Sequence, residues 1–339
     1  MAVVLGIDLG GTRLRAAWTP ATRTAGPAQA PLDVRALGEE PAPQTAAQLA
    51  ARVDAHAEAA RAASGGDVVA IGVTIPGLVD GTVCRWVPNL AYLDGLDLAT
   101  LLAPAGDGRT TVVAGNDAQL ALLAEAANGA ASGTRDAILV AVGTGIGSAV
   151  LSQGRIARGA HGGACSFGWA CADLSDPGDE RSGWLERQAS GRALDALGAT
   201  LRPPRDGAGL IGAARDGDEA ALTALRPAVD ALGATLAGAV ALLDPEVVLL
   251  AGGVAAATDV LQPLLREALA PRLPRHLRDV PVRAGAFGPG AGIAGALIAA
   301  RSGPTWWELA EPRGLPPAAA EGLAQGLVLP RQGDGSDDR

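Results

Sequence analysis

Two segments with the same strand–turn–strand pattern constrain the fold of this chain more than any other feature. The first occupies residues 3–18 and turns at Gly10-Gly11-Thr12, and the second occupies residues 136–150 and turns at Gly143-Thr144-Gly145. Apolar runs of strand length flank both turns, which is the pattern of a β-hairpin. Because the same supersecondary unit occurs twice, we predict two similar α/β halves that face each other.

The two glycine-rich turns are suited to phosphate binding. Glycine N–H groups can approach phosphate oxygens closely, and the Thr12 hydroxyl adds a donor. Asp8, near the end of the first strand, can hold the hydrated magnesium ion that accompanies ATP. A Gly-Gly-Thr sequence alone is equally an ordinary hairpin turn. The second turn is similar to a dinucleotide fingerprint, but a strand follows it rather than a helix, which argues against a nicotinamide cofactor.

A third glycine turn follows another apolar run. Residues 245–251 are typical of a strand and lead into Gly252-Gly253. Small residues there would let an adenine and a ribose lie flat against the backbone. Together the three turns predict an ATP site between the two halves.

A junction of strand and helix carries the candidate catalytic residue. An apolar strand ends at Val113, and Gly115 permits a close turn. Asn116 can cap a helix over residues 118–127. The first turn of that helix then carries Asp117, where the positive end of the helix dipole keeps a carboxylate ionised and able to take a proton from a substrate hydroxyl. An Asn-Asp pair is more often only a helix cap, but the glycine turns on both sides favour the catalytic interpretation.

Composition limits the remaining possibilities. A chain of 339 residues with 48% hydrophobic content can bury a large core and suggests two domains. Its net charge of −9 argues against a nucleic-acid partner, and because it contains no lysine every cationic role must fall to arginine. Cys84, Cys165 and Cys171 form neither a disulfide framework nor a zinc-ligand pattern. The apolar start reaches Asp8 too soon for a signal peptide or a membrane span, so we expect a soluble cytoplasmic protein.

Six runs resemble, in this order, the motifs of the ROK family of sugar kinases and repressors in the actin-like ATPase superfamily; they lie around Asp8, Pro76, Asn116, Gly143, Gly159 and Gly252. The resemblance covers about residues 3–301. It implies a two-domain actin-like (ribonuclease H-like) α/β fold with the nucleotide and the sugar in the cleft between the domains. Family repressors carry a DNA-binding helix-turn-helix ahead of the first strand, and here that strand starts at Val3, so we expect a kinase, and a homodimer.

The resemblance also implies domain boundaries and residue roles. We expect residues 1–115 with 288–302 to form the smaller domain, 116–287 the larger one, and 303–339 an extension whose end is disordered. The implied nucleotide contacts are Gly10, Gly11, Thr12, Gly143, Thr144 and Gly145 for the phosphates, Gly252 and Gly253 for adenosine, and Asp8 for magnesium through water. The implied sugar contacts are Asn89, Asn116 and Asp117, with Asp117 as the general base. On local grounds Asn89, which follows Pro88, equally suits a turn.

The chain departs from the family motif that contacts the sugar and binds zinc. Ser166 stands where the family has a sugar-binding Glu, and Trp169 stands where it has a His that contacts sugar and zinc. The three cysteine ligands that follow are absent, while the sugar-side Glu186 remains. We therefore expect no zinc site, with Trp169 and Trp184 filling the space by apolar packing.

These departures bear on the acceptor. Without the Glu and the His, a substrate with the full hydroxyl pattern of glucose would leave polar groups unpaired. We therefore predict an ATP-dependent kinase that phosphorylates the exocyclic primary hydroxyl of a cyclitol or modified sugar, like the seven-carbon cyclitols that some family members use. An ordinary glucokinase is the alternative. A non-catalytic sugar-sensing protein is the alternative of another class, and the retained Asp8, Thr12, Asp117 and Thr144 argue against it.

Overall fold

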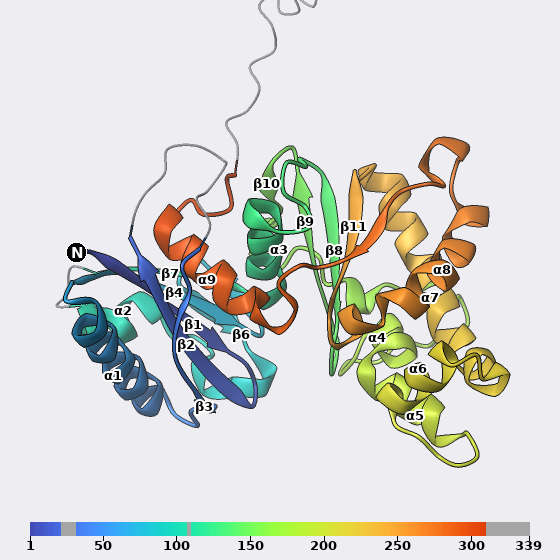
Figure 1. The fold of residues 1–339 in the computed structure, drawn as a ribbon, viewed down its shortest axis with the longest axis horizontal. Coiled ribbons are helices and arrows are strands. Elements are labelled where there is room, and N and C mark those ends of the chain that lie inside the picture. Colours follow the sequence, from blue (N-terminus) through green and yellow to red (C-terminus); the bar gives the residue numbers. More distant parts are fainter. Residues whose placement is uncertain (22–31, 107–109, 310–339) are drawn as a thin grey trace, which may run out of the picture.

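Two five-stranded sheets, each with its own helices, lie side by side in the computed structural model of this chain (Figure 1). The structure describes residues 1–21, 32–106 and 110–309. The end of the C-terminal extension, expected to be disordered, lies outside the described residues. The expected α/β fold with two similar halves is confirmed.

The first sheet has the order β3-β2-β1-β4-β7. Its strands are β1 (Val3–Leu9), β2 (Arg13–Pro20), β3 (Arg35–Pro41), β4 (Val68–Ile75) and β7 (Thr111–Asn116). The predicted hairpin of β1 and β2 is antiparallel, whereas β4 pairs with β1 and β7 in parallel. Because parallel neighbours share one direction, the strand ends that carry Asp8 and Asn116 meet at the same edge of the sheet.

Smaller elements complete this half. Helix α1 (Ala46–Ser64) begins at the cap Thr45, ends at Gly65 in the left-handed conformation, and buries one face that includes Leu49 and Val53. The hairpin β5 (Leu78–Asp80) and β6 (Val83–Trp86) precedes the short helices η1 (Pro88–Leu93) and α2 (Leu98–Leu102).

The second sheet repeats this plan in the order β10-β9-β8-β11-β12. Its strands are β8 (Ala137–Val142), β9 (Ile146–Ser152), β10 (Arg155–Ile156), β11 (Val247–Gly252) and β12 (Val282–Ala284). As in the first sheet, an antiparallel hairpin pairs through its first strand with a parallel strand. The repeat predicted from the two glycine turns is thus confirmed.

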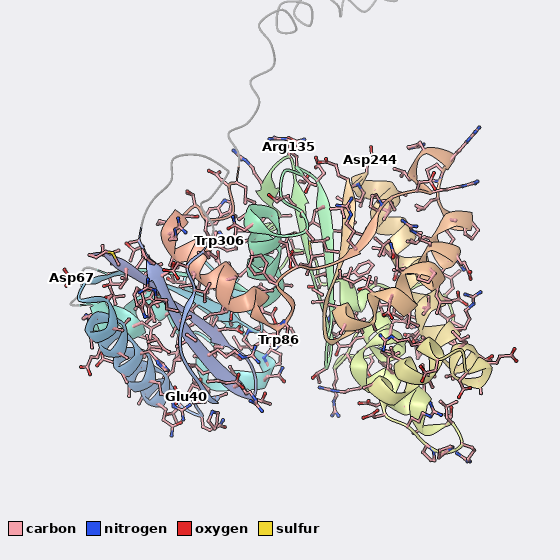
Figure 2. All side chains as sticks on the ribbon, in the orientation of Figure 1. Glu40, Asp67, Trp86, Arg135, Asp244 and Trp306 are labelled. Atoms are coloured by element: carbon pink, nitrogen blue, oxygen red, sulfur yellow. The ribbon has the colours of Figure 1, made fainter. Side chains whose placement is uncertain are left out.

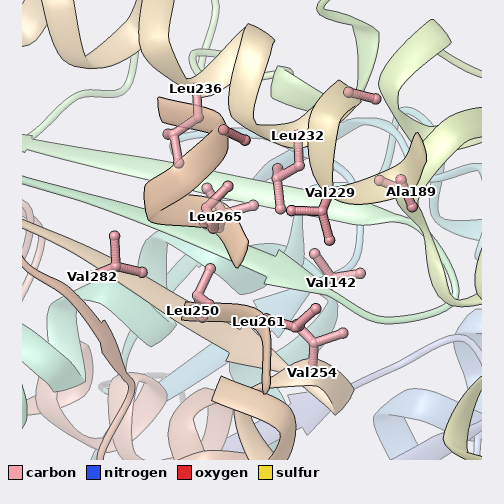
Figure 3. Packing of buried hydrophobic residues seen from close by; sticks show 14 of the residues in the cluster. Val142, Ala189, Val229, Leu232, Leu236, Leu250, Val254, Leu261, Leu265 and Val282 are labelled. Carbon is pink, nitrogen blue, oxygen red and sulfur yellow. The ribbon is translucent and has the colours of Figure 1, made fainter. Parts of the chain in front are cut away.

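Five helices cover one face of the second sheet: α4 (Trp184–Ala189), α5 (Gly191–Ala199), α6 (Gly207–Arg215), α7 (Glu219–Leu243) and α8 (Thr258–Leu269). Figure 3 shows aliphatic side chains of α4, α7 and α8 packed with those of β8 and β11, and side chains of α5 and α6 belong to the same core. Helix α7 is long and apolar enough to cross a membrane by length and composition. It packs against α4, α5, α6 and α8, however, and over half of its most apolar window is buried, as is typical of a core helix.

Helices α3 (Asp117–Asn128) and α9 (Ala291–Ser302) pack against each other between the two sheets (Figure 1). Glycines allow this close packing. A Cβ at Gly72 of β4 would lie 1.9 Å from the carbonyl oxygen of Ala296, and one at Gly295 would lie 2.0 Å from that of Leu120. The helices can therefore approach β4 and each other only because these side chains are missing.

Candidate active site

Asn116 caps α3 and thereby positions Asp117. The Asn116 side-chain oxygen accepts the N–H groups of Ala118 at 3.0 Å and Gln119 at 3.4 Å, and its amide donates to the carbonyl oxygen of Gly77 at 3.1 Å. An oxygen of the Asp117 carboxylate accepts the Ala118 N–H at 2.8 Å. Asn116 therefore ties the start of α3 to the turn that follows β4, and both the oxygen and the nitrogen of its side-chain amide are used in these hydrogen bonds.

The electrostatic setting of Asp117 favours proton uptake. Solvent reaches the residue, yet protein atoms crowd its carboxylate. This crowding raises the pKa of Asp117 to about 6, and the negative charge of Asp8 acts in the same direction, while the Ala118 N–H and the Asn116 side chain oppose it. At neutral pH the carboxylate is mostly ionised but binds a proton more readily than an ordinary aspartate, which suits a general base.

Asp8 lies in a network of its own at the end of β1. Its Oδ1 accepts a hydrogen bond from the Thr74 hydroxyl at 2.7 Å, and the Arg15 guanidinium lies 3.7 Å from Oδ2. Burial raises the pKa of Asp8, although Thr74 and Arg15 both act to lower it. A Cβ at Gly292 would lie 2.5 Å from Oδ1, so the first turn of α9 approaches this carboxylate only because residue 292 is glycine.

The first glycine turn lies next to Asn89. The Gly10 N–H donates to the Arg13 carbonyl at 2.8 Å, which closes the turn, and Thr12 is exposed. A Cβ at Gly11 would come within 3.1 Å of the Asn89 Cβ. The structure thus brings Asn89 to the turn expected to bind phosphate.

The second glycine turn lies next to Glu186. The Gly143 N–H donates to the Gly145 carbonyl at 2.9 Å, while nothing lies within 4 Å of the position that a Gly143 Cβ would take. Glu186 Oε2 accepts the Ile146 N–H at 3.3 Å and would lie 2.8 Å from a Cβ at Gly145. Glu186, expected on the sugar side, therefore also contacts the end of the second turn. The neighbouring Thr144 is exposed.

The third turn adjoins the second. Gly252 has a φ of 74°, and a Cβ there would lie 2.6 Å from the carbonyl oxygen of Val142. Glycine is required at this position for both reasons. Since Val142 directly precedes Gly143, the structure brings Gly252 and Gly253 beside the second turn.

The residues expected to replace the family's Glu and His lie at a short 3-10 helix, η3 (Phe167–Trp169), with Ser166 at its N-cap. Ser166 is exposed, and its hydroxyl donates to the Gly163 carbonyl at 3.2 Å. The prediction that Trp169 fills space by apolar packing is wrong, because Trp169 is 45% exposed. The backbone makes the close contact instead, since a Cβ at Gly183 would lie 2.3 Å from the Trp169 Cα. Trp184, in contrast to Trp169, packs against the core of this half as expected.

An ion pair and tight turns hold the segment where the family has its zinc ligands. Arg187 pairs with Asp176 at 2.6 Å and donates to the Ser182 carbonyl at 2.6 Å. Asp179 accepts the backbone N–H groups of the two residues that follow Glu180. Within the described residues no cluster of three or more His, Cys, Asp or Glu side chains could hold a metal ion. The absence of zinc stays a prediction.

Three residues near these turns were not predicted from the sequence. Arg15 contacts Asp8 and also donates to the Pro289 carbonyl at 3.0 Å; the lack of lysine was the one signal that an arginine would serve here. Glu125 is buried and accepts the N–H groups of Ala286 and Phe287, which join β12 to α9. Trp306 contacts the junction that carries Asp117.

Comparison with known proteins identifies a matching family and similar proteins of known activity. The model of the ROK family matches residues 4–302. A kanosamine kinase of Amycolatopsis mediterranei is 30% identical over 305 residues, covering 87% of this chain and 95% of the relative. A glucokinase of Streptomyces coelicolor is 27% identical, covering 89% and 98%. Among solved structures, a ROK glucokinase of Streptomyces griseus in complex with glucose and AMPPNP has a TM-score of 0.68 and 26% identity, covering 89% and 100%.

Proposed function

Because this chain belongs to the ROK family, we propose that it is an ATP-dependent kinase acting on a hydroxyl of a sugar or sugar-like polyol. One observation carries the proposal. Asp117, a carboxylate with a raised pKa, lies on the first turn of α3 within the electrostatic influence of Asp8. This is the arrangement needed to take a proton from an acceptor beside a bound nucleotide.

The glycine turns would bind ATP. The open space beside Gly143 and the exposed hydroxyls of Thr12 and Thr144 suit phosphate oxygens, and the turn at residues 252–253 suits adenosine. Asp8, with one oxygen already bonded to Thr74, would hold magnesium through water. When bound, that ion neutralises charge on the phosphates.

Asp117 would act on the acceptor. Its carboxylate takes the proton from the substrate hydroxyl as that oxygen attacks the γ-phosphorus in line. The bond between the γ-phosphorus and the bridging oxygen to the β-phosphate breaks, and ADP leaves with the electron pair. The phosphorylated alcohol departs, and Asp117 returns its proton to solvent. Because Asn116 caps α3 and fixes its first turn, the Asp117 carboxylate needs little reorganisation before the proton is transferred.

Closure of two domains would exclude water. We assign residues 1–115 with 288–302 to the smaller domain and 116–287 to the larger. The contacts of Glu125 with residues 286 and 287 support a hinge where the chain returns to the first sheet. The proposal includes a cytoplasmic homodimer.

The acceptor is proposed to be a cyclitol or modified sugar, phosphorylated on its exocyclic primary hydroxyl. Ser166 cannot offer the charge of a Glu, and the exposed Trp169 ring offers an apolar face to a substrate ring. The similarity to a kinase of a sugar other than glucose supports this preference. A glucokinase remains the second candidate, because relatives of that activity cover almost the whole chain.

Release of ADP by the purified protein tests the proposal. Glucose, kanosamine, N-acetylmannosamine and a valienol-type cyclitol would be compared at equal concentration with ATP and magnesium. Acceptor-dependent ADP release supports a kinase, whereas saturable sugar binding without any ADP release would favour the non-catalytic sensor. A kcat/KM for glucose near 10⁵ M⁻¹s⁻¹, about the ordinary enzyme range, would exclude the cyclitol preference.

A further inference from the structure

The segment of residues 303–309, here named the C-terminal strap, links the two halves. It follows α9, which packs on the first sheet, and lies beyond residues 4–302 that match the family. The strap then pairs with β10 at the edge of the second sheet: the Ile156 N–H donates to the Trp307 carbonyl at 2.8 Å, and the Leu309 N–H donates to the Gly154 carbonyl at 2.9 Å. Figure 1 shows the chain passing from α9 towards β10.

Side chains fix the strap on the second half. The Arg158 guanidinium lies 4.4 Å from the centre of the Trp307 ring, a cation–π contact. Glu308 pairs with Arg155 at 3.6 Å. The Trp306 ring meets the Trp307 ring edge to face, with centres 5.8 Å apart. Because Trp307 is anchored, the position of Trp306 is also determined.

Trp306, labelled in Figure 2, packs directly against the junction of β7 and α3. It is only 3% exposed. A Cβ at Gly115 would lie 2.7 Å from an atom of the Trp306 indole and 2.9 Å from Leu120 Cγ. Gly115 is therefore enclosed between the strap and α3, one residue before Asn116 and two before Asp117.

We propose that Trp306 is a positioning residue for phosphoryl transfer, which holds the Gly115 backbone so that Asp117 keeps its place relative to the acceptor hydroxyl. Glycine has the most backbone freedom of all residues, so a rigid junction at Gly115 needs support from its neighbours. The Asn116 cap supports the junction from the helix, and Trp306 supports it from the strap. The inference rests on the proposed role of Asp117 as the general base.

Activity and local exchange together test the inference. For Trp306→Ala we expect kcat to fall roughly 10- to 100-fold, the scale of an effect from misplacing a reactive group by about 1 Å, with the KM for ATP within about twofold. Trp306→Phe should restore most of the kcat, because a ring still contacts Gly115. Ile298→Ala, buried in the same core on α9, is the matched control for loss of stability alone.

Hydrogen exchange of the Trp306→Ala protein gives a readout independent of turnover. Amide exchange over residues 114–119 should accelerate in Trp306→Ala and stay unchanged in Ile298→Ala. Unchanged exchange in Trp306→Ala, or a kcat within about threefold of the wild type, would overturn the inference. If Asp117→Asn retains activity, the base assignment fails instead, and if Asp117→Asn is inactive while Trp306→Ala retains its kcat, only the inference fails.

Discussion

Asp8 at the end of β1 and Asp117 at the start of α3 interact electrostatically, and the charge of Asp8 helps to raise the pKa of Asp117. Protein atoms also surround each carboxylate. The positive charge of Arg15 lies next to Asp8 and partly offsets its negative charge. The two residues come from different ends of the site, one suited to the metal–nucleotide and one to the acceptor. A change that removes the charge of Asp8 should therefore lower the pKa of Asp117.

The first prediction concerns pH. As the proposed base, Asp117 could accept a proton only when ionised, and its pKa is raised from 3.8 to about 6. The kcat/KM for the acceptor should therefore be constant well above pH 6 and fall about tenfold per pH unit below it. A profile measured with an acceptor that does not titrate checks this. A profile that stays flat down to pH 5 would contradict the assignment.

Replacement of Asp117 by asparagine gives the second prediction. The change removes the base but preserves shape, so kcat should fall roughly 10²- to 10⁴-fold while ATP binding is retained. Because folding raises the pKa of Asp117 from 3.8 to about 6, the protonated carboxyl stabilises the fold at pH values below 3.8, and this stabilisation is lost as the pH rises through about 6. The variant should thus melt higher than the wild type at pH 8. Retention of over a tenth of the kcat would refute the role.

The third prediction concerns the segment without zinc ligands. The ion pair of Arg187 and Asp176 holds the segment in which we expect no zinc. Chelators should therefore leave the melting temperature unchanged. Arg187→Met should weaken acceptor binding, because α4 also carries Glu186. The hydrogen bond from Arg187 lowers the pKa of Asp176. The ion pair therefore contributes to the stability of the fold near neutral pH, and this contribution is lost as the pH falls through the lowered pKa. One tightly bound zinc per chain by elemental analysis would disprove this account.

A fourth prediction tests the glycine packing between the sheets. Gly72→Ala places a Cβ 1.9 Å from the Ala296 carbonyl, so α9 must move, and we expect a loss of about 1–3 kcal/mol or more. Gly212→Ala on α6 is the control, since nothing lies within 4 Å of its Cβ, and it should be neutral or stabilising by up to about 1 kcal/mol. Chemical denaturation of both variants measures the difference. Equal stabilities would mean that the helix approach is looser than described.

Local features of this protein could be predicted from sequence, whereas contacts between distant residues could not. The hairpin at Gly10-Gly11-Thr12 and the Asn116 cap depend on neighbouring residues, so their patterns are visible in the chain itself. The contact of Trp306 with Gly115, and that of Glu186 with Gly145, depend on how separate elements pack. No local rule specifies which side chain will meet a glycine from another part of the fold.

Trp169 shows the same limit from another direction. The loss of a His at this position predicted a tryptophan that fills the space of a metal site, but volume alone does not say which way a ring points. The backbone of Trp169 packs against Gly183, and the residue as a whole stays 45% exposed.

The last prediction concerns acceptor choice. If Ser166 and Trp169 disfavour glucose, restoring the family residues with Ser166→Glu/Trp169→His should raise kcat/KM for glucose relative to a cyclitol by roughly 10- to 100-fold, the value of one charged hydrogen bond. The gain arises because a carboxylate can accept from sugar hydroxyls that serine leaves unpaired, while a cyclitol lacking those hydroxyls gains nothing and loses the Trp169 ring. Ser182→Glu adds the same charge to a neighbouring loop and is the control, for which the ratio should not change. The ratio would be measured by ADP release with both acceptors, and an unchanged ratio in the double variant would mean that selectivity resides elsewhere.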